Sequence, residues 1–119
     1  MFIDSSARGV YVIAPTPFLV DGSVDVPSID RMVDFYLECG TNGITVMGQM
    51  GEAPKLDEQE AVEIASRVIR RAGVPVIVGV SAPGFAAMRS LSRTVMGNPL
   101  RARKIASARH PLRGPVANW

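Results

Sequence analysis

The chain has 119 residues, of which 47% are hydrophobic and 20% are charged, which suits one domain with a buried core. No apolar run approaches the ~20 residues that span a bilayer, residues 1–9 lack the apolar segment of a secretory signal, and the single cysteine excludes an intrachain disulfide. We therefore expect a cytoplasmic protein with no membrane partner.

The charge is distributed unevenly along the chain. Residues 1–96 hold all eleven acidic residues and eight of the thirteen basic ones, which gives a net charge of −3. Residues 97–119 hold five basic residues and no acidic one, a net charge of +5. This change divides the chain into a folded region, 1–96, and a basic tail rich in proline and arginine, 97–119.

The first strand and helix are predicted within residues 9–40. The β-branched run Val10 to Ile13 is typical of a strand that is buried on both faces in a parallel sheet. The following helix is predicted to have Asp25 as its N-cap, Pro27 in its first turn and Gly40 just after its end. Its apolar residues recur at spacings of three and four, on one face: Ile29, Met32, Val33, Tyr36 and Leu37.

Two further units of the same kind follow. A strand is predicted over 43–47, and Asp57 with Glu60 forms a capping box that opens the second helix. A third strand is predicted over 74–80 and a third helix over roughly 85–96. The order βαβαβα, with crossovers long enough for parallel pairing, predicts the α/β class and fits either a piece of a (β/α)8 barrel or a small open sheet.

Residues 97–119 carry no convincing strand and no amphipathic helix. Prolines at 99, 111 and 115 interrupt the segment, and we expect it to be disordered. A basic tail can contact nucleic acid or an anionic surface. Since Trp119 is its one aromatic residue, we expect no specific nucleic-acid binding.

The chemistry of a parallel α/β fold lies on the loops after its strands. Here Gly48 and Gly51 bracket Gln49 and Met50, so the backbone can turn sharply and present N–H groups that bind a carboxylate or a phosphate. The alternative is a plain connection, in which Glu52 bonds to loop N–H groups.

Other polar residues receive no role in catalysis. Thr16, between two prolines, is interpreted as a turn hydroxyl, and Lys55 as a solvated residue after the loop. Lys104 and His110 fall in the tail. No cysteine and histidine cluster has metal-ligand spacing and no nucleophile–base set is visible, so we assign no catalytic residue and no metal ligand.

Four motifs occur in the order and spacing of a known family. They are Thr16-Pro17-Phe18 with Asp21-Gly22-Ser23-Val24-Asp25, Asp34-Phe35-Tyr36 with Gly40-Thr41-Asn42-Gly43, Gly48-Gln49-Met50-Gly51-Glu52-Ala53 with Glu60, and Pro75-Val76-Ile77-Val78-Gly79-Val80. Over about residues 8–96 the chain resembles the dihydrodipicolinate synthase / N-acetylneuraminate lyase family, in which the loop commonly reads G-[ST]-T-G-E. The tail carries none of the resemblance.

The resemblance implies the first three βα units of a TIM barrel and a class I lyase, an aldolase or a dehydratase. Such enzymes form a Schiff base between a lysine and a 2-oxo acid, usually pyruvate, and no further cofactor is implied. The resemblance makes Gly48, Gln49, Met50 and Gly51 substrate-binding residues, largely through backbone N–H groups. Because Gln49 and Met50 stand at two hydroxyl positions, the family's proton relay is lost, which favours a divergent 2-oxo-acid lyase over dihydrodipicolinate synthase itself.

The family's Schiff-base lysine on strand six and tyrosine on strand five have no counterpart here, and neither Lys55 nor Lys104 matches the lysine motif. We therefore expect a truncated family member that is inactive alone, and the change near residue 97 suggests a shift of reading frame. One alternative is a non-enzymatic half-barrel that functions only by self-association or with a partner, since its open sheet would make it oligomeric or prone to aggregation. Another is a nucleic-acid-associated protein that uses the basic tail.

Overall fold

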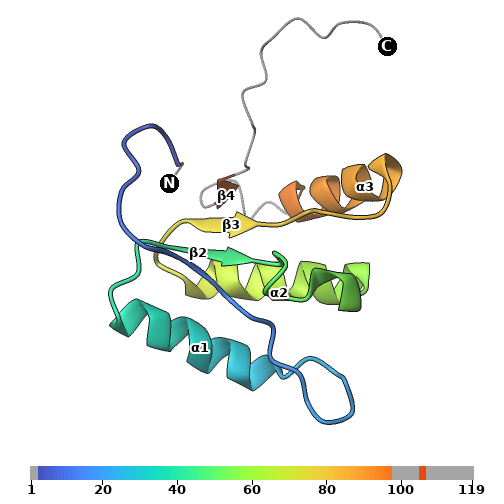
Figure 1. The fold of residues 1–119 in the computed structure, drawn as a ribbon, viewed down its shortest axis with the longest axis horizontal. Coiled ribbons are helices and arrows are strands. Elements are labelled where there is room, and N and C mark those ends of the chain that lie inside the picture. The colour runs from blue at the N-terminus through green and yellow to red at the C-terminus, as the bar shows by residue number, and fades with distance from the viewer. Residues whose placement is uncertain (1–2, 98–104, 107–119) are drawn as a thin grey trace, which may run out of the picture.

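The computed structural model describes residues 3–97 and 105–106. Strands and helices alternate along these residues (Figure 1). In chain order the elements are β1 (Tyr11–Ile13), α1 (Val26–Glu38), β2 (Gly43–Val46), the 3₁₀ helix η1 (Ala53–Lys55), α2 (Glu58–Arg71), β3 (Val76–Val78), α3 (Phe85–Met96) and β4 (Ile105–Ala106). This order confirms the predicted α/β class and the three predicted βα units.

The strands form one parallel sheet in the order β1-β2-β3-β4. In this sheet Val12 of β1 lies opposite Ile44 of β2, and Ile44 lies opposite Val76 of β3. Because the strands run the same way, the segments that follow β1, β2 and β3 emerge at one end of the sheet. The loop predicted to bind a ligand lies at that end.

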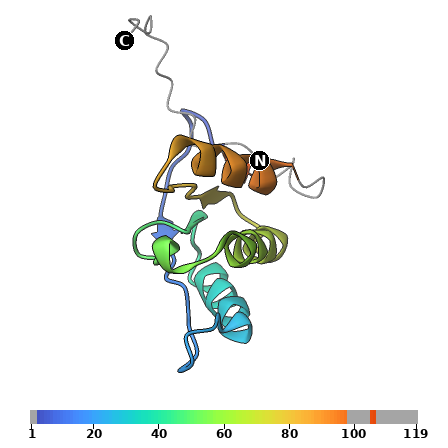
Figure 2. The ribbon, with the colours of Figure 1, turned by 90° about the vertical axis from the view of Figure 1, so that its right-hand side faces the viewer.

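The core lies between the sheet and helices α1 and α2, which are on one side of the strands (Figure 2). Alternate strand residues supply one half of it, as the period of two in a strand requires. The helices supply the other half from the faces that the sequence predicted: Ile29 and Val33 of α1, and Ala61, Ile64, Ala65, Val68 and Ile69 of α2. None of the helices in the described part of the chain is both long and apolar enough to cross a membrane.

Both long helices packed on the sheet begin where the sequence predicted. The Asp25 carboxylate accepts the N–H of Ser28 at 3.1 Å and caps α1. The Asp57 carboxylate accepts the N–H of Glu60 at 2.7 Å, and the Glu60 carboxylate accepts the N–H of Asp57 at 3.0 Å. This capping box fixes the point where the loop after β2 enters α2.

The third strand is shorter than predicted. Residues 74–80 were expected to be extended, but regular pairing covers Val76–Val78. Pro75 has no N–H to donate, although its carbonyl still accepts the N–H of Ile44 at 3.0 Å. At the other end, the N–H of Gly79 donates to the carbonyl of Val46 at 2.9 Å, so single bonds extend the pairing beyond the strand.

The prediction that no strand follows residue 96 is wrong at Ile105–Ala106. These two residues form β4, and they pair in parallel with Val76 and Ile77 of β3. A strand of two residues is too short to show any hydrophobic alternation, which is why the sequence pattern missed it. The disorder predicted for the rest of the tail concerns 98–104 and 107–119, which lie outside the described residues.

Candidate functional site

The loop after β2 is built from two overlapping turns. The N–H of Gly51 donates to the carbonyl of Gly48, and the N–H of Glu52 to the carbonyl of Gln49, each at 3.1 Å. The residues at the two ends of the loop have left-handed backbones, with φ of 56° at Met47 and 53° at Glu52. Such a backbone costs on the order of 1 kcal/mol for a residue with a side chain. Contacts with neighbouring segments must therefore hold this shape.

The backbone turns sharply between Gly48 and Gly51, as the sequence predicts, but its left-handed residues lie outside these two glycines. Neither Gly48 nor Gly51 has a positive φ, whereas the flanking Met47 and Glu52 do. Gly51 is needed for a different reason: a Cβ there would lie 3.0 Å from the Met47 nitrogen and 3.4 Å from the Ala14 carbonyl oxygen. Around Gly48 nothing would meet a Cβ within 4 Å.

Three neighbouring N–H groups of the loop are available to a ligand. Those of Gly48, Gln49 and Met50 donate to no protein acceptor in the described part of the chain. They come just before the donors of the two turns, as the first N–H groups of a helix come before its first internal bond. Neighbouring donors of this kind bind anionic oxygens. The fourth predicted residue, Gly51, is buried and its N–H is used within the loop.

Thr16 joins this loop to the segment after β1. Its Oγ1 donates a hydrogen bond of 2.6 Å to the carbonyl oxygen of Gly51, 35 residues away in the chain. The residue is 7% exposed and is the one buried polar residue among those that the structure describes. From the sequence this side chain is expected to be a local turn hydroxyl, because nothing in the sequence indicates its distant partner.

In the alternative sequence interpretation, the Glu52 side chain bonds to loop N–H groups. In the described residues Glu52 makes no such side-chain bond. Its carboxylate forms an ion pair with Lys55, and the two side chains are 41% and 69% exposed. The pairing follows from η1, because residues three apart lie one above the other in a 3₁₀ helix. In the described residues no group of three His, Cys, Asp or Glu side chains is placed to hold a metal ion.

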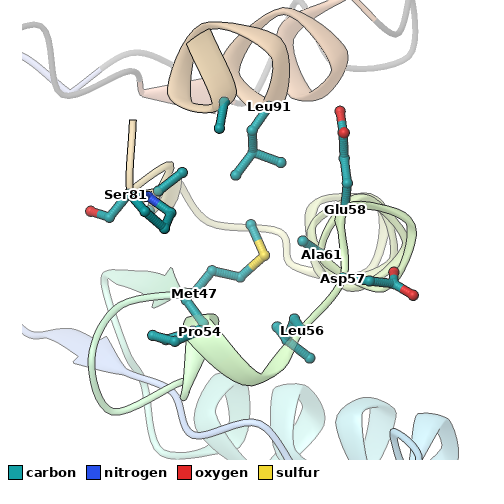
Figure 3. Close-up of a pocket in the computed structure, with 13 residues that line it drawn as sticks. Met47, Pro54, Leu56, Asp57, Glu58, Ala61, Ser81 and Leu91 are labelled. Atoms are coloured by element: carbon teal, nitrogen blue, oxygen red, sulfur yellow. The ribbon is translucent and has the colours of Figure 1, made fainter. Parts of the chain in front are cut away.

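A cavity of about 410 Å³ lies beside the loop (Figure 3). Met47, Leu56 and Leu91 line it, together with the first turns of α2 and α3. The carboxylate of Asp57 is used by the capping box, and that of Glu58 accepts bonds of 3.3 Å from two hydroxyls of α3. None of the four predicted substrate-binding residues lines this space, which is therefore separate from the three available donors.

Residues 6–95 match the model of the dihydrodipicolinate synthetase family. The chain belongs to this family. The 4-hydroxy-tetrahydrodipicolinate synthase of Laribacter hongkongensis is 42% identical over 76 residues, which are 62% of this chain and 26% of that protein. The crystal structure of dihydrodipicolinate synthase from Rhodopseudomonas palustris is similar with a TM-score of 0.76 and 56% identity, over 82% of this chain and 33% of that one.

Two further family structures extend this comparison. The chloride-inhibited dihydrodipicolinate synthase from Acinetobacter baumannii, solved in complex with pyruvate, has a TM-score of 0.70 and 32% identity over 74% of this chain and 31% of that one. N-acetylneuraminate lyase from Proteus mirabilis has a TM-score of 0.73 and 26% identity over 85% of this chain and 34% of that one. The chain therefore spans about a quarter to a third of the length of these relatives. The comparisons confirm the predicted family and match the fold to the N-terminal part of its TIM barrel.

Proposed function

We propose that this dihydrodipicolinate synthetase family member binds the carboxylate of pyruvate or another small 2-oxo acid on the loop Gly48–Gly51. The observation that carries the proposal is the set of three adjacent N–H donors at Gly48, Gln49 and Met50, at the C-terminal end of β2. A similar solved structure, from Acinetobacter baumannii, was determined with pyruvate bound, which supports a 2-oxo acid as the class of ligand. Binding of this kind uses backbone atoms, so it tolerates Gln49 and Met50 at positions where the family commonly has hydroxyls.

The binding is expected to be weak. A hydrogen bond to a charged group contributes about 1.5–3 kcal/mol, and part of the sum offsets the motion that the ligand loses. A net free energy of about 4 kcal/mol corresponds to a dissociation constant on the order of 1 mM.

The side chains of the loop favour a divergent 2-oxo-acid aldolase or dehydratase over dihydrodipicolinate synthase itself. Met50 is 63% exposed, and its thioether has no proton to transfer. Gln49 is also exposed. The loop thus keeps the backbone donors and lacks the hydroxyl relay that the family resemblance implies for these positions. We also propose that the chain acts in the cytoplasm.

We further propose that the ligand stays non-covalently bound, so that the chain by itself performs no Schiff-base lyase reaction. Schiff-base formation needs a neutral lysine amine that faces the carbonyl carbon. Lys55, the one lysine in the described part of the chain, is largely exposed and paired with Glu52. Lys104 lies outside the described residues.

Calorimetric titration with pyruvate tests the binding, and treatment with pyruvate and borohydride followed by intact mass tests its non-covalent nature. The methyl ester of pyruvate, which keeps the carbonyl and lacks the charge, is the matched control ligand. We expect saturable binding of pyruvate, much weaker binding of the ester and no increase in mass. A borohydride-dependent increase in mass would contradict non-covalent binding, and equal affinity for acid and ester would contradict carboxylate recognition.

A second candidate function is assembly, in which the half-barrel acts only with another copy or with a partner. β1 is an edge strand of the sheet, and it bonds to β2 through Val10 and Ala14. The backbone groups of the alternating residues, Tyr11 and Ile13, therefore face the open edge. Ile13 is 53% exposed, and no charged residue lies between 9 and 20 to protect this edge.

Size-exclusion chromatography with light scattering tests the assembly. We expect a measured mass above that of the 12.7 kDa monomer. The substitution Ile13→Lys should lower this measured mass, because it places a charge on the open edge. The matched control is Phe35→Lys, because Phe35 is a similarly exposed residue on α1, away from the edge. A monomer at all concentrations, or an equal effect of both substitutions, would exclude assembly through this edge.

A further inference from the structure

The shape of the ligand-binding loop depends on one peptide unit, the one that joins Gly51 to Glu52. A peptide is planar, so its carbonyl and its N–H point in opposite directions. The N–H of Glu52 donates to the carbonyl of Gln49 at 3.1 Å, and the Gly51 carbonyl accepts from Thr16 Oγ1 at 2.6 Å. The unit is therefore held from both sides, once by the loop itself and once by a side chain from another segment.

Thr16 is well suited to hold this peptide because its own position is rigid. It precedes Pro17, which disfavours a helical backbone at Thr16 and fixes φ at the next residue. The carbonyl of Pro17 accepts the N–H of Asp25 at 2.9 Å, which ties the segment to the N-cap of α1. With 7% of its surface exposed, the Thr16 side chain has little freedom to turn away from the loop.

The hydrogen bond also helps to hold Glu52 in its left-handed conformation. Met47 and Glu52 both have left-handed backbones, and Glu52 belongs to the peptide that Thr16 holds. Without that bond, rotation of the peptide would release Glu52 from its left-handed conformation and break its turn bond to Gln49. The Gly51 carbonyl would then be free to turn towards the ligand side, where its oxygen would repel a carboxylate.

We propose that Thr16 is a positioning residue, whose hydroxyl keeps the Gly51–Glu52 peptide turned so that the N–H groups of Gly48, Gln49 and Met50 remain available to a carboxylate. The inference rests on the proposed function for its ligand. Its structural part, the fixed orientation of the peptide, is independent of any ligand.

The test compares Thr16→Val, which removes the hydroxyl at nearly constant volume, with Thr16→Ser, which keeps it. The matched control is Thr41→Val, because the Thr41 hydroxyl also donates to backbone carbonyls, those of Gly43 at 2.8 Å and Val10 at 3.1 Å, but before β2 rather than after it. Two quantities are measured on the full chain: the hydrogen-exchange rate of the Glu52 amide and the affinity for pyruvate.

We expect Thr16→Val to accelerate exchange at Glu52 and to weaken pyruvate binding, each by about tenfold, the effect of one lost hydrogen bond of ordinary strength. Thr16→Ser should restore both values to within about threefold, and Thr41→Val should change neither. Exchange at Val68, a core amide of α2, reports global unfolding, and the change at Glu52 must exceed it.

Unchanged exchange at Glu52 in Thr16→Val, or a change no larger than that at Val68, would overturn the inference. If the unsubstituted chain binds no pyruvate, the proposed function fails, and the exchange rates still decide whether Thr16 holds the peptide. If pyruvate binds and Thr16→Val exchanges faster but keeps its affinity, the peptide orientation does not serve the ligand and the positioning role is wrong.

Discussion

Gly79 and Met47 approach each other so closely that no side chain fits between them. A Cβ on Gly79 would lie 2.2 Å from the Met47 carbonyl oxygen. The N–H of Gly79 also donates to the carbonyl of Val46 at 2.9 Å. The end of β3 thus supports the point where the loop after β2 begins, and this support requires a residue without a side chain.

The substitution Gly79→Ala is therefore expected to destabilise the fold by about 2–3 kcal/mol, since backbone atoms must move to admit the methyl group. Gly73→Ala is the matched control, because a Cβ on Gly73 would meet nothing within 4 Å. Urea unfolding followed by circular dichroism measures both. Equal midpoints for the two variants would show that the close approach has no energetic consequence.

The two glycines of the loop should respond differently to the same substitution. Gly51→Ala places a methyl group 3.0 Å from the Met47 nitrogen, whereas Gly48→Ala places one in open space. We expect Gly51→Ala to weaken pyruvate binding by about tenfold or more, a change of about 1.4 kcal/mol, and Gly48→Ala to leave it within about threefold. Calorimetric titration measures both affinities, and a larger loss for Gly48→Ala would mean that the loop binds through different geometry.

The capping box of α2 should contribute measurably to stability. Asp57→Ala leaves the N–H of Glu60 without its acceptor and is expected to cost about 1 kcal/mol. Asp57→Ser keeps a capping oxygen and should recover most of that loss. The neighbouring Gln59→Ala, at an exposed position, is the control and should change the free energy of unfolding by less than about 0.5 kcal/mol. A neutral Asp57→Ala would show that the cap is not needed.

The ion pair between α1 and α2 should make stability fall in acid. Arg67 donates two hydrogen bonds of 2.8 Å to Asp30, and these hold the pKa of the Asp30 carboxyl below its ordinary value. A carboxyl whose pKa is lower in the folded chain stabilises the fold above its unfolded pKa, about 3.9, and this contribution disappears as the pH falls through the folded pKa. We expect the unsubstituted chain to have a larger free energy of unfolding than the Asp30→Asn variant at about pH 6. This difference should shrink towards about pH 2.5.

Glu38→Gln is the control for this comparison, because Glu38 is an exposed carboxylate of the same helix with no ion pair among the described residues. Chemical unfolding at the two pH values gives the differences. If the Asp30→Asn difference is the same at both, Asp30 does not contribute through its charge.

The helix ends could be predicted from the sequence because their causes are local. Asp25 caps a residue three positions away, and Asp57 and Glu60 satisfy each other across the same distance. The parallel order of the strands followed from the lengths of the crossovers, which are also visible in the sequence. The four-motif resemblance then identified which parallel fold the units belong to.

The conformation of the loop could not be predicted because its causes are distant. The bond from Thr16 to Gly51 spans 35 residues, and no spacing in one sequence indicates which hydroxyl meets which carbonyl. The left-handed backbones fall on Met47 and Glu52, whereas propensity alone places them on glycine. Packing against Gly79 and Thr16 overrides that propensity.

The most direct test of carboxylate binding by this loop is a titration with pyruvate followed at single backbone amides by nuclear magnetic resonance. We expect saturable chemical-shift changes at the Gly48, Gln49 and Met50 amides, with a dissociation constant on the order of 1 mM, and no such changes on titration with the methyl ester. Saturable shifts confined to the cavity beside the loop, or none at these three amides at tens of millimolar pyruvate, would contradict carboxylate binding by this loop.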